Sequence, residues 1–109
     1  MSKITTHVLD AVLGKPAAGI VVRLERMEDS GFIPVSLIVT DSDGRCRDLA
    51  GDAKEGVYRL TFATGDYMKR LSRSTIYPEV SITFYCGGDL HYHLPLLLSD
   101  NGYTTYRGS

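Results

Sequence analysis

The sequence predicts an all-β domain, a sandwich or a barrel, and three observations support this. Several short runs alternate apolar and polar residues with the period of two that a half-buried strand shows. Clusters of Gly, Pro, Asp and Asn interrupt these runs about every dozen residues. Only one segment lacks this β character. At 109 residues, and with no internal repeat or linker, the chain is expected to form a single domain over 1–109.

The expected strands share β-branched and aromatic residues, and the segment 20–27 shows the alternation most clearly. Ile20, Val22 and Leu24 fall on one face of it, whereas Val21 and Arg23 fall on the other. The expected strands are 4–9, 20–27, 32–40, 56–64, 79–86, 90–98 and 103–106. The expected turns are 14–19, 28–31, 41–45, 86–89 and 100–102. The turn at 86–89 is interpreted as a hairpin, and Gly44 is expected to supply the positive φ of the turn at 41–45.

The exception to the β pattern is 65–73, which contains no β-branched residue and is predicted to be one short helix. Asp66 stands near its start, where an acidic side chain can accept a hydrogen bond from a free backbone N–H. We therefore predict Asp66 as the N-cap.

Composition excludes several functional classes. The formal net charge of −1 provides no field for attracting nucleic acid or an anionic membrane, so neither partner is expected. No apolar run approaches the roughly 20 residues that span a bilayer, and residues 1–7 lack the apolar stretch of a secretory signal. We expect a cytoplasmic location, in which Cys46 and Cys86 are free thiols. Because a lone chain of this size buries only about two-thirds of its surface, association into an oligomer would stabilise it.

Histidines are the first candidates for chemistry. His91 and His93 are two apart on an expected strand and project to one face, and His7 lies in the first strand, which in a sandwich can pair with a late one. A strand histidine is more often a partly buried or surface residue without chemistry, so that reading stays open for each. A three-histidine zinc site is a second alternative, although no carboxylate is placed to orient the imidazoles.

Arginine and the end of the chain are the next candidates. Arg45 follows an Asp-Gly turn, and its guanidinium could bind a carbonyl or a carboxylate; Arg47 is two residues on, and the pattern alone does not choose between them. The last four residues, 106–109, carry a ring, a guanidinium and a hydroxyl directly after a strand, which suggests that they are tucked into a site. No serine elbow, phosphate loop or dinucleotide motif occurs, so no nucleotide cofactor is expected.

Four segments in order carry a family resemblance: Thr-His-Val-Leu-Asp at 6–10, Asp-Gly-Arg at 43–45, His-Tyr-His-Leu-Pro-Leu-Leu-Leu-Ser at 91–99 and Tyr-Arg-Gly-Ser at 106–109. Together they resemble the 5-hydroxyisourate hydrolase family, the transthyretin-related enzymes of urate degradation, over the whole chain. Asp100 and Asn101 stand where the family usually has a proline, a departure that concerns a turn.

The resemblance implies an all-β, transthyretin-like (prealbumin-like) sandwich of two four-stranded sheets with one short helix. It implies a homotetramer, a dimer of dimers with sites at the dimer–dimer interface, that takes 5-hydroxyisourate as its small-molecule substrate with no cofactor and no metal. The implied catalytic residues are His7, Arg45, His93 and Ser109. The implied substrate-binding residues are His7, Arg45, Tyr106 and Arg107.

The resemblance thus selects Arg45 over Arg47 and leaves His91 as a supporting polar contact. Which histidine is the acid and which the base stays open. The alternative function is that of a transthyretin-like small-molecule binding protein without catalysis. Transthyretin itself lacks these histidines and the Tyr-Arg-Gly-Ser ending, which favours the hydrolase.

Overall fold

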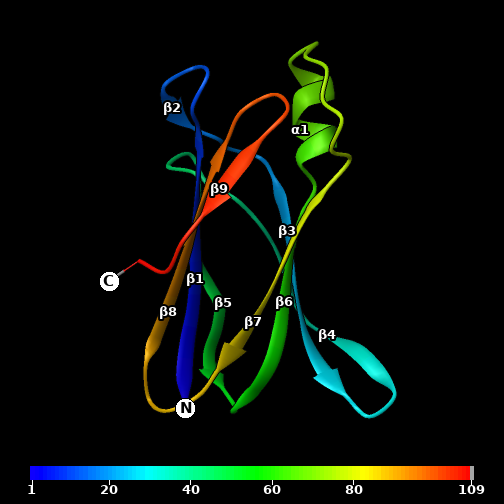
Figure 1. Ribbon diagram of the computed structural model, residues 1–109. Coiled ribbons are helices and arrows are strands. Elements are labelled where there is room, and N and C mark those ends of the chain that lie inside the picture. Colours follow the sequence, from blue (N-terminus) through cyan, green and yellow to red (C-terminus); the bar gives the residue numbers. More distant parts are fainter. Residues whose placement is uncertain (109) are drawn as a thin grey trace.

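The computed structural model describes residues 1–108 and contains two packed β-sheets and one short helix (Figure 1). The strands are β1 (Ser2–Asp10), β2 (Lys15–Pro16), β3 (Val21–Glu28), β4 (Gly31–Val39), β5 (Arg45–Ala53), β6 (Gly56–Phe62), β7 (Val80–Cys86), β8 (His91–Leu98) and β9 (Tyr103–Thr105), and the helix is α1 (Thr64–Arg70). The all-β prediction is confirmed. Among the described residues, no helix has the length and apolar character needed to cross a membrane.

The first sheet is built around β1. One edge of β1 pairs in parallel with β8 along its length, and β8 pairs in turn with β9. The other edge of β1 is shared, because β5 pairs with its first part and β2 with its last two residues. The sheet therefore contains five strands but is four strands wide, whereas the family resemblance implied four strands.

The second sheet has the order β4-β3-β6-β7, and all of its pairs are antiparallel. The alternation expected for 20–27 is confirmed, since Val22 and Leu24 are fully buried while Val21 and Arg23 are exposed. The apolar faces of the two sheets meet in one core, as sandwiches require. Cys46 and Cys86 both lie in this core as free thiols, as predicted.

Two connections differ from the sequence-based expectation. The turn at 86–89 is not a hairpin: β7 belongs to the second sheet and β8 to the first, so this loop crosses between the layers (Figure 1). The turn at 41–45 also joins the two sheets. Gly44 has the expected positive φ of 76°, and a Cβ there would lie 2.4 Å from the carbonyl oxygen of Val8, so glycine is required on both counts.

The helix occurs close to its predicted position but starts differently. Ala63 is the N-cap and makes no side-chain capping hydrogen bond, so the prediction of Asp66 as the cap is wrong. Asp66 instead lies in the first turn, where its charge favours the positive end of the helix dipole.

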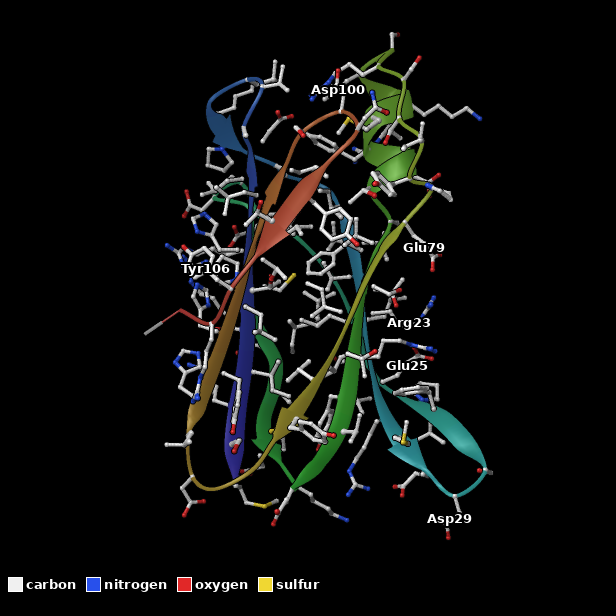
Figure 2. All side chains as sticks on the ribbon, in the orientation of Figure 1. Arg23, Glu25, Asp29, Glu79, Asp100 and Tyr106 are labelled. Atoms are coloured by element: carbon white, nitrogen blue, oxygen red, sulfur yellow. The ribbon has the colours of Figure 1, made fainter. Side chains whose placement is uncertain are left out.

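A buried carboxylate ties the helix region to the first sheet. Asp10, at the end of β1, accepts hydrogen bonds from the Tyr67 hydroxyl at 2.7 Å and from the Arg73 guanidinium at 2.5 Å. Arg73 also pairs with Asp100 in the β8–β9 turn, which lies beside the helix (Figure 2). Burial alone would raise the pKa of Asp10, but these partners and the backbone N–H of Leu13 lower it to about 2. The network fixes the ends of β1 and β8 relative to each other.

Candidate active site

Strand pairing places polar side chains side by side on the outward face of the first sheet. Alternate residues of β1 and β8 fill the core, so the intervening residues point away from it. Residues in register on neighbouring strands share a face. The registered pairs are Lys3 with His91, Thr5 with His93, and His7 with Arg45.

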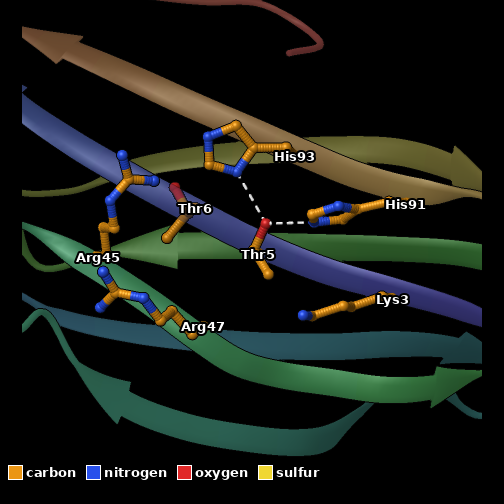
Figure 3. Close-up of a pocket in the computed structure, with 7 residues that line it drawn as sticks. All are labelled: Lys3, Thr5, Thr6, Arg45, Arg47, His91 and His93. Atoms are coloured by element: carbon orange, nitrogen blue, oxygen red, sulfur yellow. Dashed lines mark hydrogen bonds between the residues drawn. The ribbon is translucent and has the colours of Figure 1, made fainter. Parts of the chain in front are cut away.

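All of these residues except His7 line an open cavity of about 450 Å³. Three strands contribute to it: β1, β8 and the start of β5 (Figure 3). The lining residues are Lys3, Thr5, Thr6, Arg45, Arg47, His91 and His93. Among the described residues that line it none is acidic, so the cavity is electrostatically suited to an electron-rich or anionic ligand.

The Thr5 hydroxyl lies between two imidazoles. Its Oγ1 is 2.7 Å from Nε2 of His91 and 2.7 Å from Nδ1 of His93, and both contacts are drawn in Figure 3. The two rings are 6.0 Å apart between centroids. The hydroxyl therefore fixes the orientation of both rings, and it leaves Nε2 of His93 as that ring's nitrogen free for a ligand.

His93 has an unusual proton affinity. Its side chain is partly buried, and burial is the largest cause that lowers its pKa below the ordinary value of 6.5. The positive charge of Arg45, and then the neighbouring His91 and His7, lower the pKa further. The ring is therefore neutral at pH 7, the state in which an imidazole accepts a proton.

The segment after β9 packs against His93. The backbone N–H of Gly108 donates a 2.7 Å hydrogen bond to the carbonyl oxygen of His93. A Cβ at Gly108 would lie 2.8 Å from Cδ2 of the imidazole, too close for any side chain. Glycine at this position thus lets the C-terminal segment cover one edge of the ring, which supports the expectation that this segment belongs to the site.

The structure brings together part of the residue set expected from the sequence. Arg45 and His93 line the same cavity, and His7 lies in register with Arg45 without lining it in the single chain. Arg47 lines the cavity too, but it pairs with carboxylates of the 41–45 turn. Arg45 makes no such ion pair within residues 1–108, so its charge is available to a ligand, which favours it over Arg47.

The predicted tail residues lie at the margin of the site. Tyr106, labelled in Figure 2, is 54% exposed. It is not among the residues that line the cavity. The Arg107 guanidinium lies over the ring of Tyr92, 4.4 Å from its centroid. Ser109 falls outside the described residues.

Sequence reasoning missed Lys3 and Thr5 as site residues. Period-two alternation from His7 places both on its face of β1, so a signal for their orientation was present. Their neighbours on β8 depend on the parallel register, which no local pattern encodes.

The three-histidine zinc alternative gains no support from the geometry. Within the described part of the chain, no group of three His, Cys, Asp or Glu side chains is arranged to hold a metal ion. Nε2 of His91 and Nδ1 of His93 do converge, but on the Thr5 hydroxyl, and a threonine hydroxyl is not one of the usual ligands of zinc.

Sheet order, the single helix and the cationic cavity define the class: a transthyretin-like β-sandwich with an imidazole- and guanidinium-lined site. A model of the HIUase/Transthyretin family matches residues 4–108, and the chain belongs to this family.

Comparisons with individual proteins agree with this assignment. A relative from Caulobacter vibrioides named 5-hydroxyisourate hydrolase is 45% identical, with full coverage of both chains. The structure of Klebsiella pneumoniae 5-hydroxyisourate hydrolase superposes with a TM-score of 0.90 at 36% identity and also covers both chains fully. Sea bream transthyretin in complex with thyroxine gives a TM-score of 0.93 at 29% identity, covering 97% of this chain and 94% of that one. Both backbones match about equally well, so the fold alone does not distinguish a hydrolase from a thyroxine-binding protein. The distinction depends on the residues of the site.

Proposed function

We propose that this chain hydrolyses 5-hydroxyisourate to 2-oxo-4-hydroxy-4-carboxy-5-ureidoimidazoline, a step of urate degradation. The observation that supports this most directly is that one cavity holds both a neutral imidazole, His93, and a guanidinium, Arg45, that makes no ion pair within residues 1–108. The identity of the substrate is inferred from the names of the relatives. The reaction opens a cyclic amide by attack of water.

The first requirement of this reaction is a base that removes a proton from water. His93 suits the task because its lowered pKa keeps it neutral at pH 7 and its Nε2 is not occupied by Thr5. Figure 3 draws this nitrogen on the side of the ring that faces Arg45.

The second requirement is stabilisation of the negative charge that develops on the carbonyl oxygen. Arg45 supplies a fixed positive charge that no carboxylate within residues 1–108 neutralises. We assign His7, its registered neighbour, as the acid that protonates the leaving nitrogen. The product carries a new carboxylate, which the cationic lining also favours.

We assign the C-terminal residues 106–109 to a site that forms only when subunits associate. We propose a homotetramer, a dimer of dimers, in which another subunit covers the exposed Tyr106 and brings Arg107 and Ser109 to a site at the dimer–dimer interface. Tyr106 and Arg107 would bind substrate, and Ser109 would orient the attacking water. We further propose that the enzyme acts in the cytoplasm without cofactor or metal.

The alternative function, binding of a small molecule without catalysis, is the one that transthyretin in complex with thyroxine exemplifies. The cationic lining argues against an apolar ligand here, because a desolvated guanidinium and ammonium would face it without compensation.

The test is the disappearance of 5-hydroxyisourate, generated in place from urate by urate oxidase, in the presence of untagged protein. We expect decay well above the spontaneous rate and a loss of about 10²–10⁴-fold in His93→Ala and in His7→Ala. Tyr85→Phe, at an 85% exposed side chain on the other sheet, is the control and should keep full activity. A folded tetramer that binds the compound without accelerating its decay would instead establish the carrier function.

A further inference from the structure

One hydroxyl joins two imidazoles of the cavity, and only one of these is needed as a base. Thr5 Oγ1 makes 2.7 Å contacts with Nε2 of His91 and Nδ1 of His93. Thr5 is itself buried, whereas His91 is exposed and His93 is partly buried. The three side chains form a hydrogen-bonded series that runs from the partly buried His93 through Thr5 to the exposed His91.

The number of available protons limits how these three side chains can be hydrogen-bonded. A threonine hydroxyl has one proton, so when both contacts are hydrogen bonds it donates to one ring and accepts from the other. If His93 donates from Nδ1, Thr5 donates to Nε2 of His91, and Nε2 of His93 is left as a lone pair. This is the arrangement that a base requires. The protonation states of the two rings are thus coupled through a single hydroxyl.

We propose that Thr5 is a positioning residue that relays a proton from His93 to His91 during the hydrolysis proposed above. Water loses a proton to Nε2 of His93 as its oxygen bonds to the carbonyl carbon. The Nδ1 proton of His93 then moves to Thr5 Oγ1, while the proton of Thr5 moves to Nε2 of His91. His93 ends neutral with a proton on Nε2, and His91 ends as an imidazolium, so no proton is gained or lost.

The surroundings favour this direction of transfer. A positive charge on His93 is disfavoured by burial and by three neighbouring groups. These are Arg45 from β5, His91 from the same strand and His7 from β1. A positive charge on His91 faces Lys3 from β1, and Arg47 of β5 lines the same cavity. These groups are exposed, so water screens that repulsion strongly. The relay therefore moves the charge to the better solvated ring.

The relay also prepares the second half of the reaction. After transfer, Nε2 of His93 carries a proton that points into the cavity, where it can assist the leaving nitrogen alongside His7. As Nε2 gives up that proton, the excess proton of His91 returns through Thr5 to Nδ1 of His93, so both rings regain their starting states. One imidazole thereby alternates between base and acid without holding a charge in the less solvated position.

The experiment compares Thr5→Val, which keeps the β-branched shape and removes the hydroxyl, with Thr5→Ser, which keeps the hydroxyl. We expect Thr5→Val to lower kcat by about 10- to 100-fold with little change in KM, and Thr5→Ser to retain most of the activity. His91→Gln should give a similar loss, and the double variant Thr5→Val/His91→Gln no further loss, because both break the same chain. Additive losses, or wild-type kcat in Thr5→Val, would overturn the relay.

A second readout does not depend on turnover. In ¹⁵N-histidine spectra of the wild type without substrate, we expect the Nδ1–H tautomer at both His91 and His93 and linked titrations. In Thr5→Val the tautomers should change and the two rings should titrate independently, while Thr5→Ser should restore the coupling. Identical spectra in wild type and Thr5→Val would refute the coupling. If the wild type has no hydrolase activity but the rings are coupled, the proposed function fails and the hydroxyl link stands.

Discussion

The buried Asp10 carboxylate should make the stability of this protein depend on pH in a way that one substitution removes. The fall of its pKa from 3.8 to about 2 corresponds to about 2.4 kcal/mol of stability at neutral pH, at about 1.36 kcal/mol for each pKa unit. Because the folded-state pKa is lowered, this contribution is complete above about pH 5 and declines as pH falls towards the folded-state value. At pH 3 about 1.3 kcal/mol of it should remain.

The perturbation is Asp10→Asn, which preserves size and an acceptor for the backbone N–H groups of Val12 and Leu13. At pH 7 we expect the variant to lose about 2–4 kcal/mol, because Arg73 keeps only its Asp100 partner. The assay is urea unfolding of both proteins at pH 7 and pH 3. Protein concentration is held fixed, since subunit association would add its own stabilisation.

The informative quantity is the difference in unfolding free energy between wild type and variant at each pH. That difference should shrink by about 1.1 kcal/mol from pH 7 to pH 3. Asp29→Asn, at an exposed carboxylate in the β3–β4 turn, should show almost none of this change (Figure 2). A wild-type-to-variant difference that is equal at both pH values would refute the lowered pKa and the role given to the Arg73 pair.

Three further predictions concern the site and the core. Gly108→Ala should lower kcat about tenfold or more, because the added Cβ would lie 2.8 Å from the His93 ring. Its thermal unfolding temperature should stay near that of the wild type, and unchanged initial rates would contradict the contact. If His93 is the base as proposed, activity should stay level as pH falls through 6.5 and decline only below it, because the pKa of His93 is lowered and a base must be neutral. A decline centred above pH 6.5 in kcat profiles would exclude this assignment. Cys46 should resist iodoacetamide at pH 8 in the folded protein, since burial raises the pKa of its thiol to about 11, and modification seen by peptide mass analysis would show that the core opens.

Local sequence patterns were sufficient for the regular strands. Alternation marked β3 and β7 because each has one face in the core and one in solvent, and it marked β6 because apolar core residues there alternate with polar, less buried ones such as Arg59. β5 was missed for a physical reason. Its pairing with β1 contains two register shifts, so its buried residues Cys46, Leu49 and Ala53 are unevenly spaced. β2 is two residues long and carries no pattern.

The site was predictable in kind but not in arrangement. Two histidines with a spacing of two must share a face of a strand, and an arginine after an Asp-Gly turn must lie near a strand end. What no local pattern states is that β7 and β8 belong to different sheets and that β8 runs parallel to β1. A shift of one residue in that register would turn Thr5 away from His93, so the hydroxyl link is a product of tertiary pairing.

The parallel pairing of β1 and β8 also has a consequence for how the chain acquires its structure. Thr5 and His93 are 88 residues apart, and contacts of such high sequence separation are associated with slow folding. At a synthesis rate of about 5–20 residues per second, β1 leaves the ribosome roughly 4–18 s before β8 is made. During that interval the edge of β1 that will later receive β8 has free N–H and C=O groups and can pair with other nascent chains. The edge of the strand that carries His7 is thus open to misassembly until β8 is made, and the cavity between β1 and β8 forms only after that strand has been synthesised.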